Sequence, residues 1–478
     1  MSTRAEAITR RLWELEHVRL VTALVAIALA LMIIPVRAAS LAKPSEFQLA
    51  NGMRIVVVPD HRVPIITHMV FYRIGSVDEQ SDENGVAHYL EHLMFKGTPK
   101  HPRGEFDRVV MRGGGVQNAT TSHDSTVYYQ RLPRRDLEKL MALEADRMEN
   151  LDIDDAAAVK EQAIVKEEFL GTSNQPGLPF HYATAGALYG THPYALAPIG
   201  TEASIATFNA AGAMRFYRRH YRPERAIVVI GGDVTEEEVR VLAERTYGRV
   251  SGRSSDVVSE LPVLAPLIPT QPTTQRVVVP HSRVSAVHIR RSYLTPDARS
   301  VPLRDATALN LFSYIVGNGV LSRLHQGLVV KGLASSTSTG LELRRYAGAL
   351  SFEATALPGV SEAALENAFD QVLAEVAEQG ITEHEFNEMK LRFLATRVYD
   401  EDNTASRCQT IGSSLIVGWS LDDVLGFKSR VEGLTLDDVN RVGRNILNTA
   451  RSVTGLLVPQ SMAQPNGTAQ STPTTSQN

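Results

Sequence analysis

Two histidines and a glutamate lie close together in the string GVAHYLEHLMFKGT. His88 and His92 are four residues apart, so on a helix they lie one turn apart on the same face. Glu91 follows His88 by three residues and borders that face. Two imidazoles and a carboxylate at this spacing can supply two ligands to a catalytic zinc and a base that takes a proton from water.

The order of these residues is H-x-x-E-H, the inverse of the commoner H-E-x-x-H string, and both orders are typical of metal-dependent hydrolysis. The alternative is a helix that carries a surface glutamate and two unrelated histidines. His192 and His220 do not stand at metal-ligand spacing, and we interpret them as structural or surface residues.

A catalytic zinc usually takes a third protein ligand and keeps one position open for water. Downstream, the stretch DDAAAVKEQAIVKEEFLG predicts an acidic helix that contains Glu161, Glu167 and Glu168. Glu161 and Glu168 are seven residues apart, so they share a face and can point at one site. Glu167 would point about 100° away from Glu168, and we interpret it as part of a solvated charged face.

Three segments, HYLEH, GGGVQNATTSHDSTVYYQ and EQAIVKEEF, together resemble the pitrilysin/insulinase family of zinc peptidases. This family includes the mitochondrial processing peptidases, and the chain is also similar to bacterial processing-peptidase-like subunits. The resemblance covers residues 45 to 458. It implies that His88, His92 and Glu168 bind one Zn²⁺ per chain and that Glu91 is the general base.

The resemblance also implies that Glu161 is a carboxylate beside the site that supports the zinc ligands. The choice of Glu168 over Glu167 as the third ligand rests on its register with Glu161. The implied reaction is amide hydrolysis, in which Glu91 takes a proton from water and returns it to the leaving amine.

Length and composition place limits on the other classes of function. A chain of 478 residues with 43% hydrophobic content fits two to four globular domains. A net charge of −4 does not indicate a surface that binds nucleic acid. The one cysteine, Cys408, excludes an internal disulfide and a cysteine-rich metal site.

The N-terminal segment, residues 1–39, is predicted to be a signal peptide or a membrane anchor. Several arginines precede an apolar run from Leu20 to Ile34, and Val36-Arg37-Ala38 offers a small-residue cleavage pattern. A mitochondrial presequence is the rival interpretation, but acidic residues and the long apolar run argue against it. We therefore expect a periplasmic or extracytoplasmic protein, tethered to the inner membrane through residues 20–34 if the segment is retained.

The remaining chain predicts an α+β fold made of two homologous α/β domains, each a mainly antiparallel sheet packed against helices. QRVVVPHSRVSAVHIRRSYLTPD echoes MRIVVVPDHRVPIITHMVFYRIGS after about 220 residues, which indicates a duplicated domain. The second copy lacks H-x-x-E-H. The predicted parts are a zinc-bearing domain over 45–250, a linker over 251–275, a domain without zinc over 276–458 and a disordered tail over 459–478.

The stretch VQNATTSHDSTVYYQRLP follows three glycines and is rich in strand-forming residues. The resemblance implies that it is an edge strand that pairs with an extended peptide substrate, with Asn118 and Ala119 at the scissile region. A peptide added as a further strand is held by main-chain hydrogen bonds whatever its side chains.

The second half departs from the family pattern. Many members carry an arginine and a tyrosine there that hold the substrate, but in LVVKGLASST Val329 and Ser335 stand near those positions. Valine has no donor and serine is too short to replace tyrosine. Because the family closes two halves around a substrate, we predict a heterodimer with a homologous partner that lacks zinc, or else a homodimer.

Two other functions stay open at this stage. One is a non-catalytic assembly subunit, against which the intact zinc motif argues. The other is an enzyme that trims one dedicated precursor peptide with the same residues.

Overall fold

The computed structural model describes residues 42–251, 274–447 and 452–462, and their compact unit begins at Lys43. The predicted N-terminal segment 1–39, most of the linker 251–275 and most of the tail 459–478 lie outside these residues. Within the described ranges, no helix is both long enough and apolar enough to cross a membrane. The last described residues, Gln460–Met462, form a single 3-10 turn.

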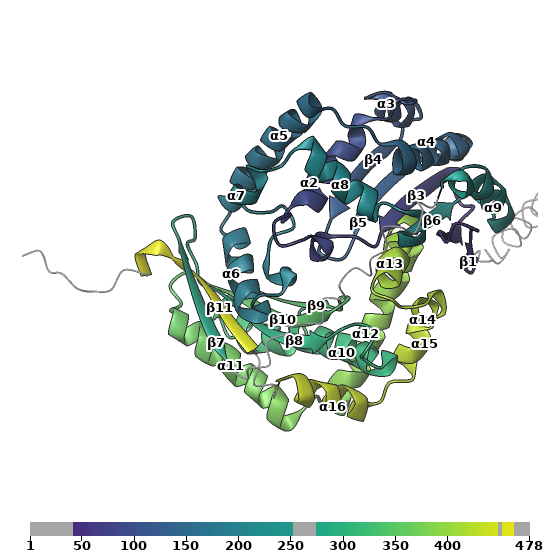
Figure 1. Ribbon diagram of the computed structural model, residues 1–478. Coiled ribbons are helices and arrows are strands. Elements are labelled where there is room, and N and C mark those ends of the chain that lie inside the picture. Colours follow the sequence, from purple (N-terminus) through teal and green to yellow (C-terminus); the bar gives the residue numbers. More distant parts are fainter. Residues whose placement is uncertain (1–41, 252–273, 448–451, 463–478) are drawn as a thin grey trace, which may run out of the picture. The chain divides into compact units, whose positions relative to one another are not determined.

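The first half of the chain forms a six-stranded sheet with the order β1-β2-β6-β3-β5-β4 (Figure 1). Neighbouring strands are antiparallel except for the parallel pair of β2 and β6. Every residue of β6 is buried, because helices cover both faces of the sheet at this central position. The strands are β1 Ser45–Gln48, β2 Arg54–Pro59, β3 Ile65–Tyr72, β4 Val116–Thr121, β5 Thr126–Pro133 and β6 Ala226–Gly232.

One face of this sheet packs against helices of the same half. Apolar residues of α2, α4, α8 and α9 join those of the strands in one core. The helices of the first half are α2 Val86–Leu93, α3 Glu105–Arg112, α4 Leu137–Asn150, α5 Asp155–Ser173, α6 Gly177–Tyr189, α7 Glu202–Ile205, α8 Ala210–His220 and α9 Glu236–Arg245.

The second half repeats the strand topology of the first. Its sheet has the order β7-β11-β8-β10-β9, and β7 and β11 are its one parallel pair among the described strands. This order matches β2-β6-β3-β5-β4 strand for strand along the sequence, so the predicted duplication and the predicted fold class are confirmed. The strands are β7 Gln275–His281, β8 His288–Pro296, β9 Ala334–Glu342, β10 Ala347–Ala356 and β11 Ser452–Pro459.

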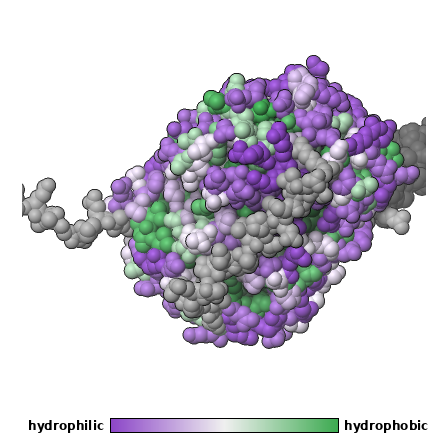
Figure 2. All heavy atoms as spheres, in the orientation of Figure 1, coloured by the Kyte–Doolittle hydropathy of each residue, from purple (hydrophilic) through white to green (hydrophobic). Residues whose placement is uncertain are grey.

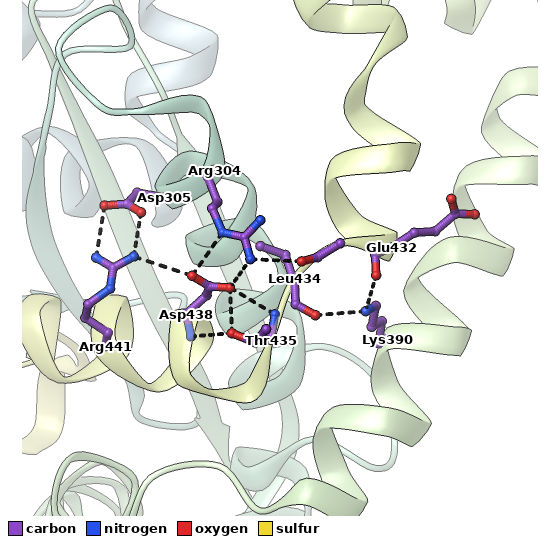
Figure 3. Close-up of polar contacts among 9 residues, drawn as sticks. Arg304, Asp305, Lys390, Glu432, Leu434, Thr435, Asp438 and Arg441 are labelled. Atoms are coloured by element: carbon purple, nitrogen blue, oxygen red, sulfur yellow. Dashed lines mark hydrogen bonds and ion pairs between the residues drawn. The ribbon is translucent and has the colours of Figure 1, made fainter.

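Ion pairs tie the helices of the second half together (Figure 3). Asp438 near the start of α16 accepts from Arg304 of α10 at 2.6 Å, and Arg441 of α16 pairs with Asp305 at 2.6 Å. Lys390 of α12 donates to two backbone carbonyls at the end of α15, those of Glu432 and Leu434. The helices are α10 Leu303–Gly317, α11 Glu362–Gln379, α12 Glu383–Asp402, α13 Thr404–Ile416, α14 Leu421–Leu425, α15 Phe427–Glu432 and α16 Leu436–Leu447, with a π-helical turn at His325–Val329.

The two halves each give one helix to the other's sheet. Helix α13 of the second half packs on the free face of the first sheet, where Gly412 lies against Phe71 (Figure 1). Helix α6 of the first half packs on β11 of the second sheet, where Gly455 lies against Phe180. The sequence did not reveal this exchange of helices, because the predicted domains were continuous stretches of chain. The predicted domain boundaries stay a prediction.

One predicted strand is two strands. The stretch VQNATTSHDSTVYYQRLP forms the hairpin of β4 and β5, with a turn over 122–125 in which the Ser122 hydroxyl bonds to the backbone of Ser125. The prediction of a single strand was wrong because the Ser-His-Asp-Ser turn signal was not recognised. The hairpin makes β4 the edge strand beside the helix that carries the histidines.

Hydrophilic residues cover most of the face drawn in Figure 2, and apolar ones gather at its left, where Figure 1 places β7 and β11. Val278 of the edge strand β7 is among the exposed large apolar residues. Pro280 removes one backbone donor from the same strand, which limits its pairing with another chain.

Candidate metal centre

Helix α2 holds His88, Glu91 and His92 within two turns. Its start is shaped by Gly85, which has φ +92° and whose added Cβ would lie 2.6 Å from the Ile199 carbonyl oxygen. The carboxylate of Glu79 accepts from the backbone N–H groups of Gly85 and Ala87, both at 2.9 Å. Glu79 therefore caps the helix whose first turn contains His88.

Helix α5 brings the acidic residues to the histidines. Asp154 caps its N-terminus by accepting from Ala157 N–H at 2.6 Å, and Tyr89 of α2 donates to the Ala158 carbonyl at 2.7 Å. Glu168 Oε2 lies 3.5 Å from His92 Nε2 and 3.8 Å from His88 Nε2. The two helices thus converge on one point.

The three groups are close enough together to hold a metal ion. Ligand atoms of His88, His92 and Glu168 all lie within 4.8 Å of one another. Atoms bound to a tetrahedral zinc lie about 3.4 Å apart, close to both of the Glu168 distances. His88 Nδ1 is buried and has no hydrogen-bond partner among the described atoms, whereas His92 Nδ1 lies 3.5 Å from Glu161. The arrangement fits zinc with both Nε2 atoms turned toward it.

The other two glutamates considered on α5 are not in this group of three. Glu167, predicted to belong to a solvated face, is exposed and does not belong to the group of ligand atoms within 4.8 Å of one another. Glu161 is only 4% exposed and lies behind His92, where Lys96 Nζ meets its other oxygen at 2.5 Å. Because Glu161 is held between His92 and Lys96, it supports a ligand rather than joining the group of three.

The protonation of these residues follows from burial and neighbouring charge. Burial and the neighbouring His92 lower the pKa of His88, which favours the neutral imidazole that binds metal. Burial alone would lower the pKa of His92, but Glu168, Glu91 and Glu161 together raise it. Contact with His92 lowers the pKa of Glu168.

Glu91 lies beside the three groups and is held by the edge strand. Its Oε2 accepts from the Thr121 hydroxyl of β4 at 2.5 Å, and the side chain is buried. Burial raises the pKa of Glu91, although the Thr121 hydroxyl acts in the opposite direction. A raised pKa lies closer to neutral pH, which suits a carboxylate that takes and returns a proton.

Asn118 and Ala119 lie in the middle of β4. This strand pairs with β5 along one edge, and no other described strand pairs with its second edge. The backbone N–H of Ala119 donates to Asn118 Oδ1 at 2.9 Å. A peptide added to this edge at Ala119 would have to displace that side chain, because the amide already has an acceptor.

Two family profiles match this chain. Residues 54–189 match the one described as Insulinase (Peptidase family M16), and residues 207–393 match Peptidase M16 inactive domain. The chain belongs to peptidase family M16. The predicted resemblance is therefore confirmed, and the metal centre lies wholly within the first of the two matches.

The chain is similar to named proteins and to solved structures of other peptidases. The zinc protease PqqE of Helicobacter pylori is 28% identical over 425 residues, which cover 88% of this chain and 94% of that protein. A solved protease from Helicobacter pylori has a TM-score of 0.81 at 27% identity, covering 88% and 100% of the two chains. The periplasmic protease PqqL of Escherichia coli has a TM-score of 0.73 at 19% identity, over 89% of this chain and 48% of PqqL.

Three residues that contact the helix or the side chains of the candidate metal centre were not identified from the sequence. Glu79 caps α2 from six residues before Gly85, Thr121 orients Glu91 from another strand, and Lys96 pairs with Glu161. Only Lys96 carried a local signal, since it follows His92 by four residues on the same helical face.

Val329 and Ser335 stand where the sequence predicts that the substrate-holding arginine and tyrosine of the family are replaced. Val329 is half-buried against the core of the second half, and Ser335 Oγ donates to the Thr355 carbonyl at 3.2 Å. The Val329 side chain has no hydrogen-bond donor, and the Ser335 hydroxyl is already bonded to the backbone. His192 and His220 are both buried, outside the metal centre.

Proposed function

We propose that this chain is a zinc-dependent endopeptidase that hydrolyses peptides or small unfolded proteins. The observation that carries the proposal is the convergence of His88, His92 and Glu168 from two helices, with a buried carboxylate, Glu91, beside them. Its membership of a peptidase family and its similarity to a zinc protease support the same activity.

His88, His92 and Glu168 would hold the metal, and the role of Glu161 is to fix His92 through Nδ1. Zinc, when bound, lowers the pKa of water and polarises a carbonyl. Glu91 accepts a proton from the attacking water on a carboxylate oxygen and delivers it to the leaving amine nitrogen. The Thr121 hydroxyl keeps that carboxylate turned toward the edge strand.

The substrate would lie along β4 as an added strand. The open edge of β4 carries Asn118 and Ala119, and Thr121 at its end connects the strand to Glu91. Main-chain pairing places a scissile carbonyl beside the base without selecting for side chains, which suits a peptidase acting on extended peptides.

A second subunit would supply the rest of the substrate grip, as a zinc-less homologue in a heterodimer or as a second copy. Val329 and Ser335 cannot donate to substrate in the expected way. The chain also spans 48% of PqqL, a length that corresponds to one half of a double-length protease. Export to the periplasm, with or without a membrane tether at residues 20–34, fits the predicted N-terminal segment and the name of PqqL.

The test is metal content and peptide cleavage measured on the full-length protein, alone and with a zinc-less homologous partner. Glu91→Gln should keep about one zinc per chain and lose turnover by at least about 10³-fold, since proton transfer is lost. His88→Ala should lose the metal itself. Cleavage by Glu91→Gln at the unmutated rate would refute the base assignment.

The same measurements separate the other two functions. Wild-type protein that binds zinc but cleaves no peptide, with or without a partner, would favour an assembly subunit. Cleavage of one precursor at one site would favour a dedicated processing enzyme.

A further inference from the structure

A cavity of about 370 Å³ lies among helices of the second half and shares no lining residue with the metal centre. It is bordered by α10, α12, α13 and α15, and by Pro44 near the start of the described chain. Cavities that hold small ligands measure roughly 300–1,000 Å³, so this one is large enough for a small molecule.

Positive charge dominates the cavity. Arg397, Arg407, Lys428 and Arg430 line it, and among the described lining residues Glu401 is the one carboxylate. Clusters of arginine are typical of sites that bind carboxylate or phosphate groups, because the guanidinium fork matches their oxygens.

Arg407 is the clearest sign of a missing partner. Its Nη1 is buried and has no hydrogen-bond partner among the atoms that the structure describes. Among the described residues, the hydrogen bonds of the Arg430 guanidinium go to the Thr307 hydroxyl at 3.3 Å and to the Asp423 carbonyl. Burial lowers the pKa of Arg430, although the Asp423 charge acts in the opposite direction. An anion in the cavity would satisfy both guanidinium groups.

The cavity lining also includes apolar residues. Trp419, Phe427 and Leu425 contribute to it, and the guanidinium of Arg397 lies 5.1 Å from the Phe427 ring centroid. Trp419 Nε1 donates to the Ala298 carbonyl at 2.9 Å, which fixes the indole ring in the wall. A free inorganic anion would leave this apolar surface unused.

We propose that this cavity binds the acidic head group of an anionic amphiphile, whose alkyl tail lies against the apolar wall. Arg407 and Arg430 would hold the head group, and Trp419 and Phe427 would contact the tail. The proposal concerns a site separate from the metal centre and does not depend on the proposed peptidase activity.

The same chemistry has two sources, a free fatty carboxylate and an anionic lipid in a bilayer. The test below distinguishes the two sources.

The chain has two tryptophans, and one of them lies in the cavity wall. In a full-length, zinc-loaded Trp13→Phe variant, fluorescence reports Trp419 alone. Octanoate and octyl phosphate should each give a saturable change, whereas octanol and inorganic phosphate at the same concentrations should not. An equal response to octanol would overturn the proposal, as would the lack of any saturable response.

Arg407→Gln, in the same background, should weaken octanoate binding at least about tenfold, because the charge-assisted contact is lost. Arg392→Gln is the matched control, since Arg392 is an exposed arginine of α12 outside the cavity. Equal affinities in the two variants would overturn the proposal. If far-ultraviolet circular dichroism shows that Arg407→Gln is unfolded, Arg430→Gln decides in its place, because Arg430 is the other guanidinium proposed to hold the head group.

Vesicles separate the two sources. A Trp419 response to phosphatidylglycerol vesicles but not to phosphatidylcholine vesicles, lost in Arg407→Gln, identifies membrane lipid as the source. A response to octanoate without a response to either vesicle identifies a free amphiphile. Metal content is measured on the same samples, so failure of this proposal leaves the metal centre assignment unaffected.

Discussion

Replacing Glu79 by alanine should loosen helix α2 without removing any proposed zinc ligand. Glu79 accepts from the N–H groups of Gly85 and Ala87, which both lie at the buried start of the helix. Because α2 has only two turns and His88 stands in the first of them, loss of the cap acts directly on one ligand.

The size of the effect follows from two opposing terms. Each buried donor left without an acceptor costs about 1–3 kcal/mol, which sets an upper limit near 6 kcal/mol for two donors. The carboxylate is itself buried, which raises its pKa to about 8, so its removal also relieves a cost. We therefore expect the free energy of unfolding of Glu79→Ala to fall by about 2 kcal/mol. If zinc must restore the order of α2, its affinity falls by up to roughly thirtyfold.

The assay is urea unfolding of the metal-free protein, together with zinc affinity from competition with a chelator. Glu167→Ala is the matched control, since it removes an exposed carboxylate next to a proposed ligand and no cap. If Glu79→Ala and Glu167→Ala gave the same urea midpoint and zinc affinity, the reasoning about the cap would be refuted.

Three further substitutions test the helix cap, the buried ion pair and the packing of α6 on the second sheet. Burial raises the pKa of Glu79 from its ordinary value of 4.5 to about 8, so the stability that its protonated form contributes is lost as the pH rises between these values. Glutamine cannot lose a proton in this way. The urea midpoint of Glu79→Gln, relative to that of wild type, should therefore rise between about pH 5 and about pH 8.5. Lys96→Met should lower the free energy of unfolding by about 3 kcal/mol, because it leaves the buried Glu161 carboxylate without its lysine partner, and adding Glu161→Gln should restore part of the urea midpoint. Gly455→Ala should lower the melting temperature, at a cost of about 1–3 kcal/mol, because its Cβ would lie 2.2 Å from Thr184 Cγ2.

Matched variants serve as controls for these changes. Lys166→Met removes an exposed lysine of α5 and should leave the urea midpoint nearly unchanged. Gly171→Ala adds a Cβ in open space on the same helix and should not destabilise the protein. A Lys96→Met variant as stable as Lys166→Met would contradict the buried pair, and a Gly455→Ala variant as stable as Gly171→Ala would contradict the close packing.

The strands and the main helices were predictable because their signals are local. Period-2 and continuous apolar runs marked β2, β3 and β6, and the echo of the first two strands in β7 and β8 predicted the duplicated sheet. The turn over 122–125 was missed, because threonine and tyrosine on both sides gave one uninterrupted strand signal.

The candidate site was predictable where spacing on one helix decides which side chains meet. His88 and His92 follow from a four-residue interval, and the choice of Glu168 over Glu167 follows from register on α5. Thr121 was not predictable in this way, because it meets Glu91 only through the packing of β4 against α2. Glu79 was not predictable either, since a loop of undetermined conformation separates it from the helix that it caps.

The second half of the chain has no H-x-x-E-H motif, but through α13 it covers one face of the first sheet. Val58, Phe71 and Val229 on the far face of the first sheet are buried by α13, which contributes Ile411 and Leu415. Without that helix the apolar far face of the first sheet would be exposed to water, a large loss of burial. The half described as inactive is therefore part of the support of the metal centre, because β3 and β5 align the edge strand that holds Glu91 through Thr121.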